Sequence, residues 1–77
     1  MWDVRFSDAC THQVRHMHWR TATKICMAVF RFAETGQGRL EWVAPRRMRL
    51  REQGAMADII FDERNGTLNV LHIFATK

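Results

Sequence analysis

Three arginines alternate with apolar residues in the segment RMRLR at residues 47–51. Side chains of a strand point alternately to its two faces, so Arg47, Arg49 and Arg51 should share one face while the residues between them point to a core. Arg46, just before the segment, would widen the basic surface. Because guanidinium groups bind phosphate oxygens through paired hydrogen bonds, the row predicts a site for a nucleic-acid backbone.

An exposed row of arginines can also serve only to keep a small sheet soluble and to block edge pairing. No acidic residue is interspersed in the row, so the like charges should repel one another on the folded sheet. Such repulsion costs stability unless an anion is bound, and we therefore favour the binding interpretation.

A second group with possible chemistry is the segment CTHQVRHMH, which begins at Cys10. A zinc site needs about four converging ligands. On a helix His12 and His16 share a face, whereas Cys10 and His18 lie on the far side of it. We therefore predict no metal site and a polar helix face whose charge depends on pH. Recruitment of the remote Cys26 as a ligand remains open.

The three tryptophans are candidates for stacking on nucleic-acid bases. Strand alternation predicts that Trp2 lies in the core, and Trp19 should pack at the bend between two helices. Trp42 is the one we expect to be exposed, where it would contact nucleic acid or a protein partner.

The composition describes one small domain, residues 1–77, with ten arginines, two lysines and a net charge of +4. Arginine excess suits an RNA or DNA partner, although genomic base composition can also produce it. Two cysteines make no disulfide framework, and no secretory signal is present, so we expect a reduced, cytoplasmic protein. The longest run of consecutive apolar residues, 25–30, is too short to cross a membrane.

The elements that position these residues begin with a predicted strand at 2–6, where apolar and charged residues alternate. Ser7 is a suitable N-cap for a helix of about ten residues starting near Asp8. A second helix is predicted over residues 21–34, with Gly36 ending it. We expect the two helices to form a hairpin bent near residues 18–20.

Strands are predicted over residues 47–51, 55–61 and 67–75, and Asn65-Gly66 should form the turn between the last two. Alternation in the last strand places His72 on the face of Leu68, Val70 and Phe74. The order is β-α-α-β-β-β, an α+β domain with a helical hairpin packed on a small, mostly antiparallel sheet.

This order of elements, together with several short motifs, resembles the RelE/ParE superfamily of bacterial toxins. The strand WDVRFS, the helical hairpin and an arginine-bearing first strand of a meander are similar to that family. The segment RLREQG…IIF…NGTLNVLHIFATK resembles the closing part of its HigB-like branch.

Membership would imply a toxin of a type II toxin-antitoxin system, neutralised by a cognate antitoxin. RelE- and HigB-like members are ribosome-dependent mRNA endonucleases, in which the RNA 2′-hydroxyl attacks its own adjacent phosphate without a metal or other cofactor. ParE-like members share the fold and poison DNA gyrase instead.

The resemblance also implies roles for particular residues. Arg47 and Arg49 fall where the family's first basic strand carries its cations, with Arg51 beside them. His72 occupies the histidine position of the "LhxF" strand, and Lys77 matches a terminal lysine that would neutralise a phosphate. A phosphorane gains from such cations, and proton transfer gains from a histidine.

Two departures from the family pattern keep alternatives open. No arginine occurs between Gly54 and Ala57, where active members carry one, and the chain has no tyrosine. The short tail that often supplies a further acid-base residue does not follow Lys77. The chain could therefore be a ParE-like gyrase inhibitor or a decayed toxin that only binds its antitoxin. An unrelated small basic protein with a converged order of elements is the third alternative.

Overall fold

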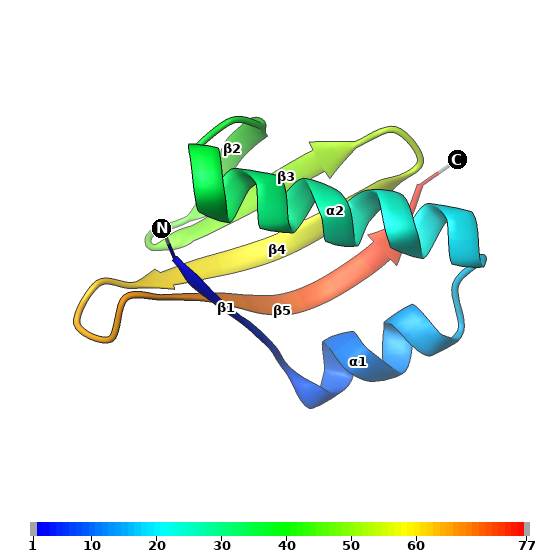
Figure 1. Ribbon diagram of the computed structural model, residues 1–77, viewed down its shortest axis with the longest axis horizontal. Coiled ribbons are helices and arrows are strands. Elements are labelled where there is room, and N and C mark those ends of the chain that lie inside the picture. The colour runs from blue at the N-terminus through cyan, green and yellow to red at the C-terminus, as the bar shows by residue number, and fades with distance from the viewer. Residues whose placement is uncertain (1, 77) are drawn as a thin grey trace.

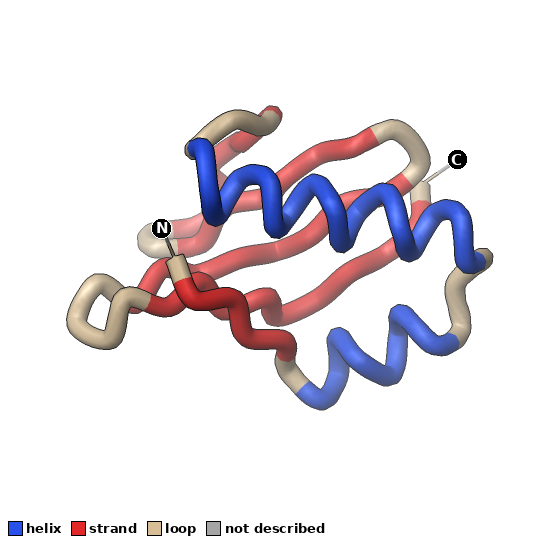
Figure 2. The backbone as a smooth tube through the Cα atoms, in the orientation of Figure 1, coloured by secondary structure: helices blue, strands red, loops and turns tan. Residues whose placement is uncertain are grey.

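The computed structural model describes residues 2–76, which form a sheet with two helices on one of its faces (Figures 1 and 2). The elements are β1 (Asp3–Phe6), α1 (Asp8–Arg15), α2 (Trp19–Thr35), β2 (Arg39–Ala44), β3 (Arg47–Glu52), β4 (Ala55–Asp62) and β5 (Thr67–Ala75). The sheet has five strands in the order β1-β5-β4-β3-β2. Only β1 pairs in parallel, with β5, and the other pairs are antiparallel. The predicted α+β class is confirmed.

The sheet contains one strand more than the sequence analysis expected. β2 pairs with β3 through residues such as Leu40, which lies opposite Leu50. Its signal is weak because most of its residues are exposed and the strand lies at the edge of the sheet. The turn into β3 places Pro45 before Arg46, whose φ is 67°, as in a type II turn.

The two helices begin and end close to where the sequence places them. The Ser7 hydroxyl accepts a hydrogen bond from the backbone N–H of Cys10 at 3.0 Å, which makes Ser7 the N-cap of α1. Gly36 follows α2 with a φ of 75°, the left-handed conformation that favours glycine at this position. His18 caps α2 at its start, because its Nδ1 accepts a hydrogen bond from the Arg20 N–H at 3.2 Å.

One hydrophobic core fills the space between the helices and the sheet. α2 contributes Ile25, Val29 and Phe32, and α1 contributes the buried Cys10. The strands contribute alternate residues, listed along the sheet as Met48, Leu50, Ala55, Ala57, Ile59, Leu68, Val70 and Ile73. Both helices lie on one face of the sheet, so the opposite face of β3, β4 and β5 is free of helices (Figure 1). No described helix is long and apolar enough to cross a membrane.

A bulge in β5 overturns the predicted face of His72. Asp58 lies opposite His72, but its neighbour Ile59 lies opposite Val70, so Leu71 is an extra residue in β5. The bulge shifts the alternation by one residue. His72 is therefore exposed on the helix-free face, away from Leu68 and Val70, although it still shares a face with Phe74.

Candidate nucleic-acid interface

The helix-free side of the sheet, called the outer face below, carries the arginine row. β3 presents its arginines there because its alternate residues, Met48 and Leu50, are buried in the core. The outer face is formed by Arg39, Glu41, Arg47, Arg49, Arg51, Met56, Asp58, Ile60, His72 and Phe74. The predicted common face of the three β3 arginines is thus confirmed.

Carboxylates from neighbouring strands correct the expectation that the row lacks acidic partners. Glu41 on β2 binds Arg51 through both Nε, at 3.0 Å, and Nη2, at 2.7 Å. Asp58 on β4 accepts a hydrogen bond from Arg49 Nε at 2.9 Å. Among residues 2–76, Arg47 is the β3 arginine with no ion pair. The acids interleave across the strands, so repulsion within the row is not an argument for a bound anion.

Arg49 lies at the centre of the outer face between a carboxylate and an aromatic ring. Its guanidinium carbon lies 5.3 Å from the centre of the Phe74 ring, while Nε donates to Asp58. The hydrogen bond to Asp58 raises the pKa of Arg49, so the guanidinium keeps its charge. Asp58 itself is only 5% exposed, which is unusual for a carboxylate and requires such a partner.

His72 joins this group from the next strand. Asp58 lies opposite Arg49 on one side and opposite His72 on the other, so the three residues form one row across β3, β4 and β5. The histidine is exposed, where it could reach a bound molecule. The structure thus brings the predicted His72 and Arg49 onto the same face through a bulge that the sequence analysis did not anticipate.

The other predicted site residues lie in different places. Arg46 is exposed in the turn before β3, beside Arg47. Trp42 is 73% exposed, as predicted, but it pairs with Met48 and therefore lies on the helix side of the sheet, away from the arginine row. Lys77 lies outside the described residues.

The remaining tryptophans divide between core and surface. Trp2 packs against the core with its ring centre 4.7 Å from that of Phe61, in agreement with its predicted place. The prediction for Trp19 is wrong, because this residue is 67% exposed at the first position of α2. Its ring stacks with that of His18, 6.0 Å away between centres, and lies 5.3 Å from the guanidinium carbon of Arg20, instead of filling the bend.

The cysteine and histidine segment is divided among different environments. Cys10 is buried in the core, and burial, with the nearby Cys26, raises its pKa to about 11. His12 and His16 contact each other at 4.6 Å between ring centres, while His18 caps α2. Within residues 2–76 no three metal-ligating side chains converge.

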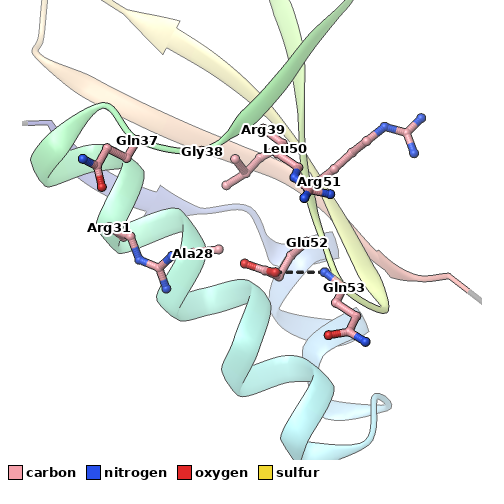
Figure 3. A pocket seen from close by; sticks show the side chains of 9 residues that line it. All are labelled: Ala28, Arg31, Gln37, Gly38, Arg39, Leu50, Arg51, Glu52 and Gln53. Atoms are coloured by element: carbon pink, nitrogen blue, oxygen red, sulfur yellow. Dashed lines mark hydrogen bonds between the residues drawn. The ribbon is translucent and has the colours of Figure 1, made fainter.

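A groove of about 570 Å³ separates the C-terminal half of α2 from β2 and β3. Arg31 of α2 and Glu52 of β3 point toward one another across it (Figure 3). Gly38 lies at its wall, where the chain turns from α2 into β2. The groove includes neither Arg47 nor Arg49, so it is distinct from the centre of the outer face.

Three residues that contact the arginines of the outer face were not predicted from the sequence: Glu41, Asp58 and Phe74. A signal for Asp58 is present, since it is the only charged residue within the apolar segment AMADIIF. The sequence alone does not identify Arg49 as the partner of Asp58, because the ion pair depends on the register between β3 and β4.

Solved structures with the same fold include toxins and toxin-antitoxin complexes. The isolated E. coli RelE toxin matches with a TM-score of 0.81 and 8% identity over 100% of this chain and 86% of that chain. The intact E. coli RelBE complex matches with a TM-score of 0.77 and 11% identity over 100% of this chain and 99% of that chain. The RelBE2 complex of Mycobacterium tuberculosis has a TM-score of 0.70 and 16% identity over 97% of this chain and 98% of that chain. No protein-family model and no curated protein matches the sequence. At these identities the likeness establishes a RelE-like fold.

Proposed function

We propose that this chain is a toxin of the RelE/ParE superfamily, from its HigB-like branch, which acts in the cytoplasm as a ribosome-dependent mRNA endonuclease. The observation that carries the proposal is the arginine-rich outer face on a RelE-like fold that extends over the whole described chain. The motif LHIFATK of the final strand favours the HigB-like branch.

The outer face offers groups suited to cleavage by the RNA's own 2′-hydroxyl. In that reaction the bond from the 2′-oxygen to phosphorus forms as the bond from phosphorus to the 5′-oxygen breaks. A base removes the proton of the 2′-hydroxyl, and an acid donates a proton to the departing 5′-oxygen. Arg47 and Arg49 would stabilise the charge that builds up on the phosphate oxygens. His72 is the candidate for proton transfer, with Arg46 and Lys77 as further cations.

Arg51 has a different role in this proposal. Its Nε and Nη2 are both bound to Glu41 Oε1, so this side of the guanidinium is occupied before any ligand arrives. We therefore assign Arg51 to holding β2 against β3 and assign phosphate contacts to Arg47 and Arg49.

The partners follow from the same proposal. The substrate is mRNA on the ribosome, and an antitoxin encoded beside the toxin would neutralise it. Two neighbours in fold are complexes of a RelE toxin with its RelB antitoxin, which supports this expectation. An acidic antitoxin segment that covers the outer face would neutralise its charge and block the substrate.

A specific observation favours a second candidate, a binding protein on the same fold. Met56 is the residue of the run 55–57 that lies on the outer face, opposite Arg51, and it is apolar where an active enzyme would gain from a cation. This alternative includes a ParE-like gyrase inhibitor and a decayed toxin that binds only its antitoxin. It predicts no RNA cleavage even with translating ribosomes present.

The test is colony formation after tightly controlled induction in a bacterial host, with soluble expression confirmed. A toxin lowers viability, and the Arg49→Ala variant at equal expression should not. Mapping RNA ends in the arrested cells then separates mRNA cleavage from gyrase poisoning. Unchanged viability with the wild-type chain, or full toxicity of the variant, would contradict the assignment.

A further inference from the structure

Two arginines of the outer face are held by carboxylates in different ways. Arg51 donates to Glu41 from both Nε and Nη2, at 3.0 and 2.7 Å. Arg49 donates to Asp58 from Nε alone, at 2.9 Å. A guanidinium has five N–H donors, of which four belong to the terminal nitrogens. Within residues 2–76 these terminal nitrogens of Arg49 meet no acceptor, so they stay available for a ligand.

The carboxylate that holds Arg49 is buried on an interior strand of the sheet. Asp58 lies in β4, which is flanked on both sides by paired strands, and it is 5% exposed. Its side chain is short, so little rotational freedom remains once it is buried. The Phe74 ring, with its centre 5.3 Å from the guanidinium carbon, gives Arg49 a second contact. The guanidinium is thereby restrained before any ligand binds.

We propose that Asp58 is a positioning residue for Arg49: it holds Nε so that the two terminal nitrogens face outward as a fork for one phosphate group. The identification of that phosphate as part of RNA rests on the proposed function. Since a fork matches two phosphate oxygens at once, fixing its plane in advance reduces the entropy lost on binding.

Simple electrostatics predicts the opposite effect for Asp58. A carboxylate close to a phosphate site lowers the local positive charge, so its removal should strengthen RNA binding. Positioning predicts that its removal weakens binding even though the net charge becomes more positive. The sign of the change therefore separates the two explanations.

The experiment measures binding of a fluorescein-labelled single-stranded RNA oligonucleotide to the purified full chain by fluorescence anisotropy at low salt. We expect Asp58→Ala to weaken binding by roughly threefold to tenfold, the size typical of a coupled pair. The matched control is Glu63→Ala, which makes the same change of charge in the exposed turn before β5. This control should bind as tightly as the wild type or slightly more tightly.

A double-mutant cycle tests whether Asp58 acts through Arg49. In the Arg49→Ala background, Asp58→Ala should cause no further loss of affinity. Arg49→Ala should also lower the slope of log Kd against log salt by roughly 0.7, the value for one lost phosphate contact on a single strand. Binding of Asp58→Ala that equals or exceeds that of the wild type, or equal losses in both backgrounds, would overturn the proposal.

Asp58→Asn covers the case in which Asp58→Ala does not fold, as judged by circular dichroism. The amide fills the same space, but its uncharged oxygen holds the Arg49 guanidinium more weakly than a carboxylate does. It should bind RNA more weakly than the Glu63→Gln control, and equal or tighter binding would overturn the proposal.

The positioning proposal and the proposed function can fail separately. If oligonucleotide binding depends on Asp58 and Arg49 but mRNA stays intact on translating ribosomes, the endonuclease proposal is wrong and the phosphate-fork proposal stands. If Asp58→Ala leaves mRNA cleavage unchanged, the endonuclease proposal stands and the positioning proposal is wrong.

Discussion

The Ser7 hydroxyl donates a hydrogen bond to the carbonyl oxygen of Leu71 at 2.7 Å and so joins the start of α1 to the bulged residue of β5. The same hydroxyl accepts from the Cys10 N–H at 3.0 Å. One side chain thus caps a helix and contacts the bulge that places His72 on the outer face.

Ser7→Ala should lower the free energy of unfolding by about 1–2 kcal/mol, because it removes both the helix cap and the donor to Leu71. Urea denaturation followed by circular dichroism measures this difference. The control is Thr23→Ala on the exposed side of α2, which should change stability by less than about 0.5 kcal/mol. Equal stability of the two variants would show that the Ser7 contacts contribute little.

The close approach at Gly38 gives a second stability prediction. A Cβ at this position would lie 2.7 Å from Cδ1 of Leu50, which is buried in the core. Gly38→Ala should therefore destabilise the protein by about 1–3 kcal/mol through overpacking. In a Leu50→Val background, which shortens the opposing side chain, the cost should become smaller. Strict additivity of the two substitutions would contradict this explanation.

The bulge in β5 and the cross-strand pairs are the features of the fold that could not be predicted from the sequence. Alternation in RMRLR correctly predicted which residues of β3 are buried, and Ser7 and Gly36 correctly marked helix ends. The run NVLHIFA is apolar almost throughout, so no break in its pattern marks Leu71 as an extra residue. The prediction for His72 therefore failed at a feature that only the pairing with β4 defines.

The acidic partners of the arginines were missed for a related reason. Glu41 and Asp58 lie 10 and 9 positions from their arginines in the chain, and only the sheet register brings them together. A strand read alone can show which face a residue occupies, but its cross-strand neighbours depend on the turns and on β2, which the sequence analysis did not predict.

Burial of Cys10 predicts a pH dependence of stability and of thiol reactivity. Its pKa rises from 9.0 to about 11 in the folded protein, mainly because burial disfavours the thiolate. The folded state keeps this proton where the unfolded chain loses it, so the contribution to stability is full below pH 9 and is lost as pH rises toward 11. A Cys10→Ala variant, although less stable, should lose less stability than the wild type over this interval.

Iodoacetamide at pH 8.5 provides the direct check on Cys10. Mass spectrometry of the native protein should find Cys10 unmodified and the partly exposed Cys26 modified first. Both should react once the chain is unfolded in urea. Native Cys10 that reacts as fast as in the unfolded chain would show that it is not buried.

The exposed histidine next to Asp58 has a separable kinetic prediction. If His72 transfers a proton, His72→Gln should slow RNA cleavage on the ribosome by roughly 10²- to 10⁴-fold and leave the affinity for an RNA oligonucleotide nearly unchanged. His12→Gln, on the exposed surface of α1, is the matched control and should cleave normally. Loss of affinity equal to the loss of rate would assign His72 to binding instead.

The most direct measurement is primer extension on a defined mRNA in a reconstituted translation reaction, with the purified wild-type chain and its Arg49→Ala variant. The proposed endonuclease predicts new RNA ends at codons in the ribosomal A site for the wild type. It also predicts no such ends without ribosomes and almost none with the variant. Intact mRNA in the presence of folded wild-type protein and translating ribosomes would contradict the endonuclease assignment.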